Sequence, residues 1–241
     1  MYLVCDSVYA TTTFQCGSRC NALQYSQFLY AFGNPTTDAA GYIALDTEKE
    51  QIVVTFRGSK SLRSYYLDSH IWKIHPSWLP TISYDSLIHA GFQKVYLSIR
   101  EPLMKELKEI SRYNPSFAIH FTGHSLGGSL AVLAAADFYL ETKYNGLEVT
   151  TFGQPRLGNL AFSNWINTLN IKIHRVTATG DIVTMLPPQL FGYHHTNDEY
   201  RILNGKTYQC DGGCNHLPSL NFTTHPLGYY NGDCESLFQQ C

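Results

Sequence analysis

The sequence has no apolar run that approaches the roughly 18 residues a membrane-spanning helix needs, so we expect no transmembrane segment. Charge is scarce: charged residues make up 15% of the 241, and the net charge is −2 with both signs dispersed along the chain. A protein that binds nucleic acid through phosphates needs a basic face, and none is expected here. The N-terminus lacks a basic region followed by an apolar stretch, so no signal peptide is visible.

Internal repeats, low-complexity tracts and linkers rich in Pro, Gly or Ser are also absent. Hydrophobic residues make up 44% of the chain, which fits a folded globular protein and argues against disorder. A chain of this length without a linker predicts one domain over residues 1–241.

The cysteines indicate an oxidising compartment. They are Cys5, Cys16, Cys20, Cys210, Cys214, Cys234 and Cys241. Two C-x3-C pairs and three cysteines near the chain ends favour disulfides and a secreted protein, with Cys241 as the expected odd one out. A zinc site built from the two C-x3-C pairs is the alternative, although the Gly and polar residues between the cysteines suit loops equally well. A sequon at Asn221-Phe-Thr is compatible with secretion.

Short apolar runs alternate with segments of helical periodicity from residue 51 onward. The predicted strands are 51–56, 117–121, 147–152 and 171–176, and the predicted helices are 92–110, 126–140 and 160–169. This alternation predicts an α/β fold with a mostly parallel central sheet and helices on both faces. Such sheets bind ligands beyond the carboxyl ends of their strands, so the chemistry is expected there.

A G-x-S-x-G motif stands between a predicted strand and a predicted helix. It reads Gly123-His-Ser-Leu-Gly127 and is followed by a further glycine. In a strand–turn–helix of this kind the serine is held in a strained conformation, and glycines flank it because side chains do not fit the corner. The context predicts that Ser125 is a nucleophile, against the alternative of a glycine-rich structural turn.

A serine hydroxyl needs a base to take its proton, and the base needs an orienting carboxylate. With this motif the three residues follow the chain order Ser, acid, His. Asp181 is the preferred acid because it follows a predicted strand, while Asp198 and Glu199 are weaker rivals just before a new strand. The histidines that come late enough are His194, His195, His216 and His225. Spacing alone leaves the choice among these four open, with His225 preferred.

Several motifs in one order resemble the class 3 lipases of fungi and yeasts, a family that includes feruloyl esterases. They are Phe56-Arg-Gly-Ser-Lys-Ser, His89-Ala-Gly-Phe, Thr122-Gly-His-Ser-Leu-Gly-Gly, Thr151-Phe-Gly-Gln-Pro-Arg-Leu-Gly-Asn, Asp181-Ile-Val-Thr-Met-Leu-Pro-Pro and Gly192-Tyr-His-His-Thr-Asn-Asp-Glu-Tyr. The resemblance covers roughly 170 residues. It implies an α/β-hydrolase fold with a helical lid, and the cysteines look most like those of a secreted yeast triacylglycerol lipase branch.

The resemblance also implies roles for individual residues. Ser125 would be the nucleophile, Asp181 the acid and His225 the base, because Tyr229 and Cys234 follow it as in the family. Ser59 and the backbone N–H of Leu126 would form the oxyanion hole, and His195 would be structural. The implied disulfides are Cys5–Cys234, Cys16–Cys20 and Cys210–Cys214. Ala178, Gly180 and Thr184 depart from the residues that many members carry beside the acid, which puts its hydrogen bonding in question.

Residues 61–72 follow the oxyanion segment and look like the family's lid, a short helix over the active site. Its apolar and aromatic residues are Leu62, Tyr65, Tyr66, Leu67, Ile71 and Trp72. An ordinary surface helix packed on the core is the alternative. An opening lid would expose apolar surface that only a lipid–water interface offsets, so interfacial activation is our hypothesis.

Three functions compete at this stage. The preferred one is a secreted, monomeric triacylglycerol lipase that uses no metal or other cofactor and contacts lipid–water interfaces transiently. A feruloyl or short-chain esterase on the same fold is second, with a more polar lid expected. A catalytically inactive lipid-binding protein is third.

Overall fold

The computed structural model describes residues 26–59, 72–79, 82–196, 198–210, 224–227 and 229. Within this part of the chain, five parallel strands form the centre of an eight-stranded sheet. They are β3 (Gln51–Phe56), β6 (Ala118–His124), β7 (Leu147–Phe152), β8 (Ile171–Ala178) and β9 (Glu199–Leu203). β3 is β-branched and apolar and is buried after Gln51, as expected of a strand covered on both faces, whereas β7 alternates buried and half-buried residues. The four predicted strands are confirmed as β3, β6, β7 and β8.

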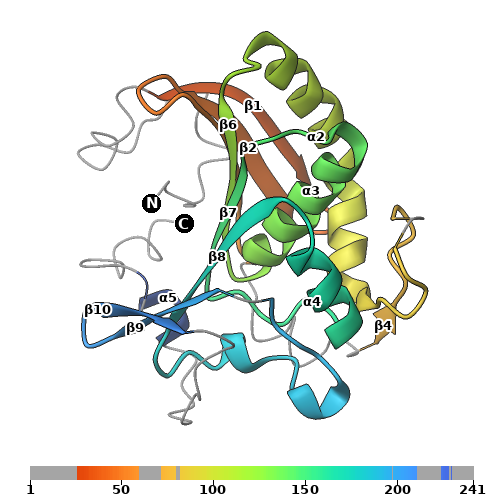
Figure 1. Ribbon diagram of the computed structural model, residues 1–241, viewed down its shortest axis with the longest axis vertical. Helices are drawn as coiled ribbons and strands as arrows, with labels where there is room; N and C mark the ends of the chain where they lie inside the picture. Colours follow the sequence, from red (N-terminus) through yellow and green to blue (C-terminus); the bar gives the residue numbers. More distant parts are fainter. Residues whose placement is uncertain are drawn as a thin grey trace.

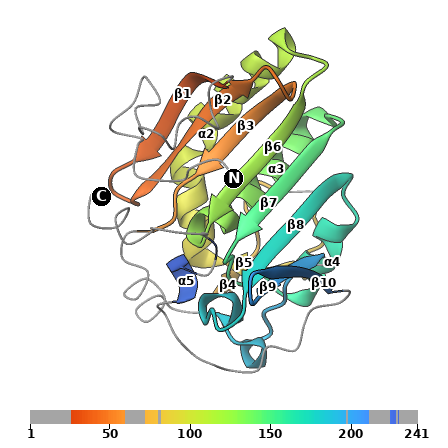
Figure 2. The ribbon, with the colours of Figure 1, turned by 90° about the vertical axis from the view of Figure 1, so that its left-hand side faces the viewer.

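Antiparallel strands extend this centre at both edges (Figure 2). On one side lie β1 (Ser26–Asn34) and β2 (Ala39–Asp46), and on the other β10 (Lys206–Cys210) pairs with β9. A separate two-stranded sheet joins β4 (Lys73–Ile74) to β5 (Ile88–His89). The hairpin of β9 and β10 turns at Asn204 and Gly205, which both have positive φ. An Asn-Gly pair between strands is a strong hairpin signal, but this hairpin is not among the elements predicted from the sequence.

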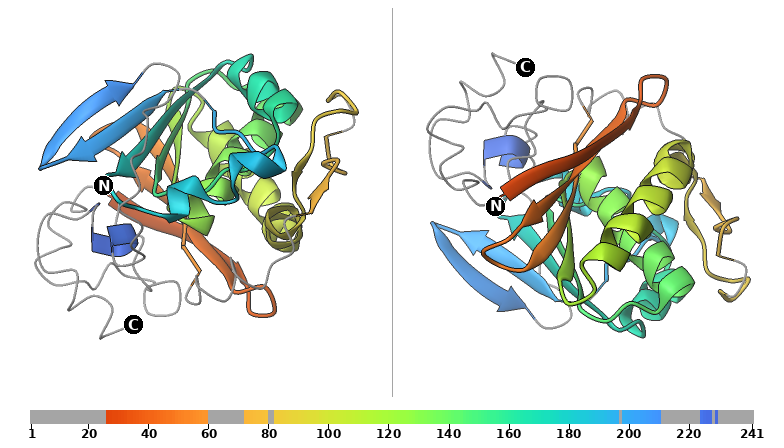
Figure 3. Two further views of the ribbon diagram at one scale, coloured as in Figure 1. Left: turned by 90° about the horizontal axis from the view of Figure 1, so that it is seen from below. Right: turned by 90° about the horizontal axis from the view of Figure 1, so that it is seen from above.

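The long helices cover one face of the sheet (Figures 1 and 3). They are α2 (Ala90–Tyr113), α3 (Leu126–Thr142) and α4 (Leu160–Asn167), within a few residues of the predicted bounds. The described helix on the opposite side is the four-residue α5 (Thr224–Leu227), so the two faces are covered unequally. None of the described helices is long and apolar enough to cross a membrane.

The hydrophobic core lies between the sheet and this helical layer. α3 is buried on all sides from Leu126 to Phe138, whereas α2 buries one stripe that includes Phe92, Ile99 and Leu107. A helix buried all round cannot rotate or slide without losing contacts on several sides. α3 is therefore a fixed support, and a single residue separates its first residue from the end of β6.

α2 and α3 are also joined by a buried carboxylate. Asp137 of α3 accepts a hydrogen bond from the Tyr96 hydroxyl at 2.5 Å and from Arg100 Nε at 2.7 Å. Burial and the charge of Asp137 hold the pKa of Tyr96 well above its usual range, so the hydroxyl remains a donor. A paired and hydrogen-bonded charge is the form in which a carboxylate can be buried between helices.

His89 caps the start of α2, and its burial predicts a pH dependence of stability. Its Nδ1 accepts from the Gly91 N–H at 3.0 Å, and burial lowers the pKa of His89 to about 4. The unfolded chain then binds a proton more readily than the folded one between pH 6.5 and about 4. Stability is complete above this window and falls as the pH drops through it, by up to about 3 kcal/mol from this group.

The test is urea unfolding between pH 7 and 4 for the native chain and for His89→Asn, in which asparagine keeps a capping side chain. We expect a flatter pH dependence in His89→Asn, whatever its stability at pH 7. Identical slopes in the two proteins would show that His89 does not titrate in this way.

Candidate active site

Ser125 occupies a sharp turn between β6 and α3. Its backbone has φ 57° and ψ −125°, and the residue is fully buried. A Cβ on Gly123 would lie 2.3 Å from the carbonyl oxygen of Gly127, and one on Gly127 would lie 2.4 Å from the carbonyl oxygen of Phe56. Both glycines of the motif are therefore required by close backbone packing, and the serine takes up the strained conformation.

Asp181 and His225 form a buried pair although they are 44 residues apart. Asp181 lies in the turn after β8, and His225 lies on α5. His225 Nδ1 is 2.9 Å from Oδ1 and 2.8 Å from Oδ2 of the carboxylate. A carboxylate only accepts, so Nδ1 carries the proton and Nε2 is left with its lone pair. The ring is thereby oriented to take a proton at Nε2.

Ser125 and His225 both lie against the turn that follows β7. The Ser125 N–H donates to the carbonyl of Phe152 at 2.8 Å, and a Cβ on Gly153 would lie 2.8 Å from His225 Cε1. Ser125 Oγ and His225 Nε2 are both buried, and neither has a hydrogen-bond partner among the described residues. In the absence of substrate, nucleophile and base are often too far apart for a short bond. The structure thus brings the three predicted residues to one place.

Further donors hold the Asp181 carboxylate. The Val183 N–H donates to Oδ1 at 2.9 Å, and the Tyr229 hydroxyl donates to Oδ2 at 2.5 Å while accepting from the Ala178 N–H at 2.9 Å. Burial and the charge of Asp181 keep the pKa of Tyr229 well above its usual range, so this hydroxyl stays protonated. The sequence identifies Tyr229 only as an aromatic residue after the expected base and does not predict its hydrogen bond to Asp181.

The rival acid and bases have other partners. Glu199 pairs with Arg175 Nη2 at 3.1 Å and accepts from the Thr177 hydroxyl at 2.7 Å. The ring of His195 lies 2.6 Å from the carbonyl of Thr184, and burial together with Arg175 and Arg156 lowers its pKa well below the usual range. His195 is therefore placed as the resemblance implied.

Two other predicted candidates, His194 and Asp198, lie away from the Asp181–His225 pair. The backbone N–H of His194 donates to Gly158, and Asp198 is exposed. His216 lies outside the described residues.

The departures from the family pattern leave Asp181 well bonded. The Thr184 hydroxyl donates to the carbonyl of Asp181 at 2.8 Å. Gly180 has φ 88°, a conformation that asparagine also tolerates, and the backbone N–H of Ala178 binds Tyr229. Asp181 thus keeps several hydrogen-bond donors and stays paired with His225 where the chain departs from the family pattern.

Leu126 and the segment that leads to Ser59 lie beside the serine. Leu126 is the first residue of α3, so its N–H has no acceptor within the helix. On the other side, a Cβ on Gly58 would lie 3.5 Å from Ser125 Cβ, which places the segment leading to Ser59 against the serine. Arg57 anchors that segment through bonds to the backbone and carboxylate of Asp38.

The other predicted residues are described only in part. Trp72 is 68% exposed, and its carbonyl accepts from the Ala90 N–H, whereas Leu62, Tyr65, Tyr66, Leu67 and Ile71 lie outside the described residues. Cys210 is disulfide-bonded, and the remaining cysteines are outside the described part. A sulfur in a disulfide is not a thiolate ligand, and no cluster of metal-binding side chains occurs among the described residues.

A family model described as "Lipase (class 3)" matches residues 53–191, which is more than half of the chain. The chain belongs to the class 3 lipase family. A secreted mono- and diacylglycerol lipase A of Penicillium cyclopium is 37% identical over 175 residues, which are 72% of this chain and 55% of that protein. This class 3 lipase chain thus spans about half the length of the curated relatives it matches.

Solved structures of lipases superpose on most of the chain. A Rhizomucor miehei lipase–propeptide complex is 28% identical with a TM-score of 0.85, covering 92% of this chain and 73% of that one. A structure described as a serine protease triad forming the catalytic centre of a triacylglycerol lipase is 28% identical with a TM-score of 0.81, covering 92% and 87%. The α/β-hydrolase fold of this class 3 lipase is thereby confirmed.

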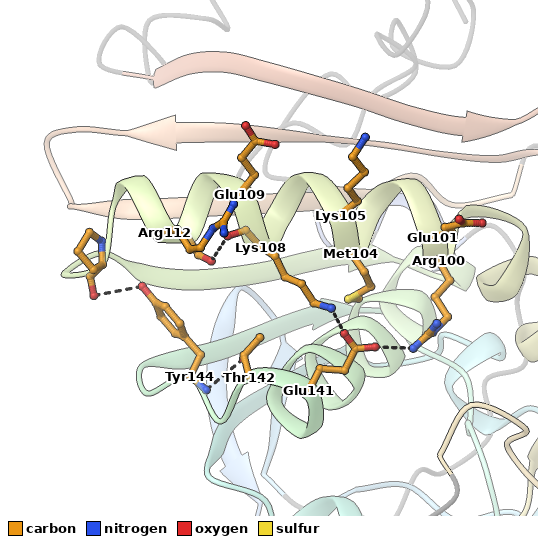
Figure 4. Close-up of a pocket in the computed structure, with 12 residues that line it drawn as sticks. Arg100, Glu101, Met104, Lys105, Lys108, Glu109, Arg112, Glu141, Thr142 and Tyr144 are labelled. Carbon is orange, nitrogen blue, oxygen red and sulfur yellow. Dashed lines mark hydrogen bonds and ion pairs between the residues drawn. The ribbon is translucent and has the colours of Figure 1, made fainter.

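A groove of about 990 Å³ lies between α2 and α3 (Figure 4). Its walls carry charged side chains, and Glu141 lies between Arg100 and Lys108 (Figure 4). Glu141 is near the C-terminal end of α3, whereas Ser125 precedes its first residue, so roughly 20 Å of helix separates them. This groove is therefore remote from Ser125.

Gly153 makes a sharp test of the Asp181–His225 geometry. It has φ 59°, and an added Cβ would lie 2.9 Å from Asp181 Oδ2 as well as against His225. Gly153→Ala should push the imidazole from the carboxylate. The measurement is the NMR signal of the hydrogen-bonded His225 Nδ1–H, which we expect to shift or vanish.

Gly205→Ala is the matched control, because Gly205 has φ 73° but nothing within 4 Å of an added Cβ. Both variants should lose about 1 kcal/mol of stability from the positive φ. An unchanged His225 signal in Gly153→Ala would contradict the packing described.

Proposed function

We propose that this chain is a secreted carboxylic ester hydrolase, a triacylglycerol lipase that acts at lipid–water interfaces. The observation that carries the proposal is the buried Asp181–His225 pair beside the turn that presents Ser125. The relatives support it: one is named a secreted mono- and diacylglycerol lipase, and another a triacylglycerol lipase with a serine protease triad. The disulfide at Cys210 fits an oxidising, extracellular location.

In the proposed reaction Ser125 Oγ attacks the ester carbonyl while His225 Nε2 accepts the hydroxyl proton. Asp181 stabilises the imidazolium that forms and keeps the ring oriented. The alcohol leaves with that proton, and water then hydrolyses the acyl-enzyme with His225 again acting as base. Acyl transfer by this route needs no metal or organic cofactor.

The negative charge of the tetrahedral intermediate is assigned to two donors, Ser59 and the N–H of Leu126. The Leu126 N–H is one of the N-terminal donors of α3, where the helix carries partial positive charge. A hydrogen bond of this kind contributes roughly 3–4 kcal/mol to the transition state. Since α3 is buried on all sides, this donor is held in place before substrate binds.

The first experiment measures fatty-acid release from tributyrin at constant pH by the native chain and Ser125→Ala. We expect a loss of at least about 10³-fold in Ser125→Ala, because no other described group can replace the nucleophile. Ser129→Ala is the matched control: Ser129 is also a fully buried serine, one turn along α3. Equal loss in both variants, or no loss in Ser125→Ala, would refute the assigned nucleophile.

The second experiment tests the interface. Residues 61–72 are proposed to form a lid whose apolar side chains are exposed on opening, so the rate should rise steeply once tributyrin exceeds its solubility. Long-chain emulsions should also be hydrolysed. A smooth saturating curve with little long-chain activity would indicate a soluble esterase instead.

Failure of a fluorophosphonate to label Ser125 would indicate a binding protein without catalytic activity.

A further inference from the structure

His124, the residue before the nucleophile, contacts the base directly. Its ring centroid lies 4.4 Å from that of His225 with the planes inclined by 35°. Its Nε2 is 3.1 Å from the backbone carbonyl oxygen of His225. His124 is thus the last residue of β6 and a neighbour of the base across 101 residues of chain.

The hydrogen bond settles the protonation of His124. A carbonyl oxygen only accepts, so Nε2–H is the donor. Burial, with a smaller effect of His225, lowers the pKa of His124 to about 3, so its ring is neutral at the pH where the base works. A neutral ring can pack against His225 without opposing the positive charge that His225 gains during proton transfer.

α5 depends on tertiary contacts for its position. A helix of four residues has almost no stability of its own, because nucleation costs more than one turn returns. On α5, the hydrogen bond from His225 Nδ1 to Asp181 holds only the imidazole ring of His225. Within the described part of the chain, the side-chain bond to the His225 main chain comes from His124.

We propose that His124 is a positioning residue, whose Nε2–H fixes the main chain of His225 and whose ring supports one face of the imidazole. The turn that strains the nucleophile thereby also sets the place of the base. This inference rests on the proposed function for its kinetic consequence, whereas its structural consequence can be measured without any activity.

The test compares two substitutions at His124 with the same two at His120. His124→Phe keeps an aromatic ring and loses the N–H donor, and His124→Gln keeps an N–H donor and loses the ring. His120 lies on the same strand and face, is also partly buried, and bonds Thr150 on the neighbouring strand β7. His120→Phe and His120→Gln therefore measure the general effect of replacing a histidine on β6.

Hydrolysis of p-nitrophenyl butyrate gives the kinetic result. We expect kcat of His124→Phe to fall on the order of 10²-fold with KM within about threefold, because a displaced base affects proton transfer more than binding. His124→Gln should recover part of that loss, and both His120 variants should stay near the native kcat. Equal kcat in His124→Phe and His120→Phe would overturn the proposal.

Amide hydrogen exchange of the peptide that carries His225 gives the structural result. Exchange should be faster in His124→Phe than in the native chain or His120→Phe, and unchanged exchange would overturn the positioning role. If Ser125→Ala hydrolyses the ester as fast as the native chain, the proposed function fails, and hydrogen exchange still decides whether His124 holds the base.

Discussion

The contact between Gly123 and Gly127 is the constraint on which the site depends. Because the two backbones touch, β6 passes into α3 within a single residue, and Ser125 takes the positive φ that this requires. The same turn directs three neighbours differently: His124 lies against α5, Ser125 stands at the corner, and Leu126 begins the helix. The proposed nucleophile, one proposed oxyanion donor and a contact to the proposed base thus come from three consecutive residues.

The acid is held by a loop that has little regular structure, so side chains must define its shape. Arg156 donates to the carbonyls of Met185 and Pro187, and His195 lies against that of Thr184. Burial, with the charge of Arg175 nearby, lowers the pKa of Arg156 to about 10, so it remains charged at neutral pH. The Arg156 guanidinium bonds two carbonyls of this loop and so restricts the backbone that carries Asp181. A buried carboxylate keeps its hydrogen-bond donors only if the backbone around it is restricted in this way.

The parallel centre of the sheet could be predicted because its strands are short apolar runs and its helices have clear periodicity. β2 could not, although it is almost wholly buried, because it reads Ala-Ala-Gly-Tyr-Ile-Ala-Leu-Asp. A Cβ on Gly41 would lie 2.3 Å from both the Phe32 ring and the carbonyl of Thr55. Close packing requires a residue with low strand propensity there, so local preference and tertiary structure conflict.

The proposed acid and the proposed base also differ in whether local sequence predicts them. Asp181 could be predicted from the residues, because it follows a strand and parallel strands end at one edge of the sheet. His225 lies on a four-residue helix that contains a proline and has no periodicity, so spacing alone leaves it one of four candidate histidines. What determines its place is a set of partners 44 and 101 residues away, Asp181 and His124. Local pattern therefore identifies groups that regular structure presents, whereas a group held only by long-range hydrogen bonds needs either a family resemblance or the fold itself.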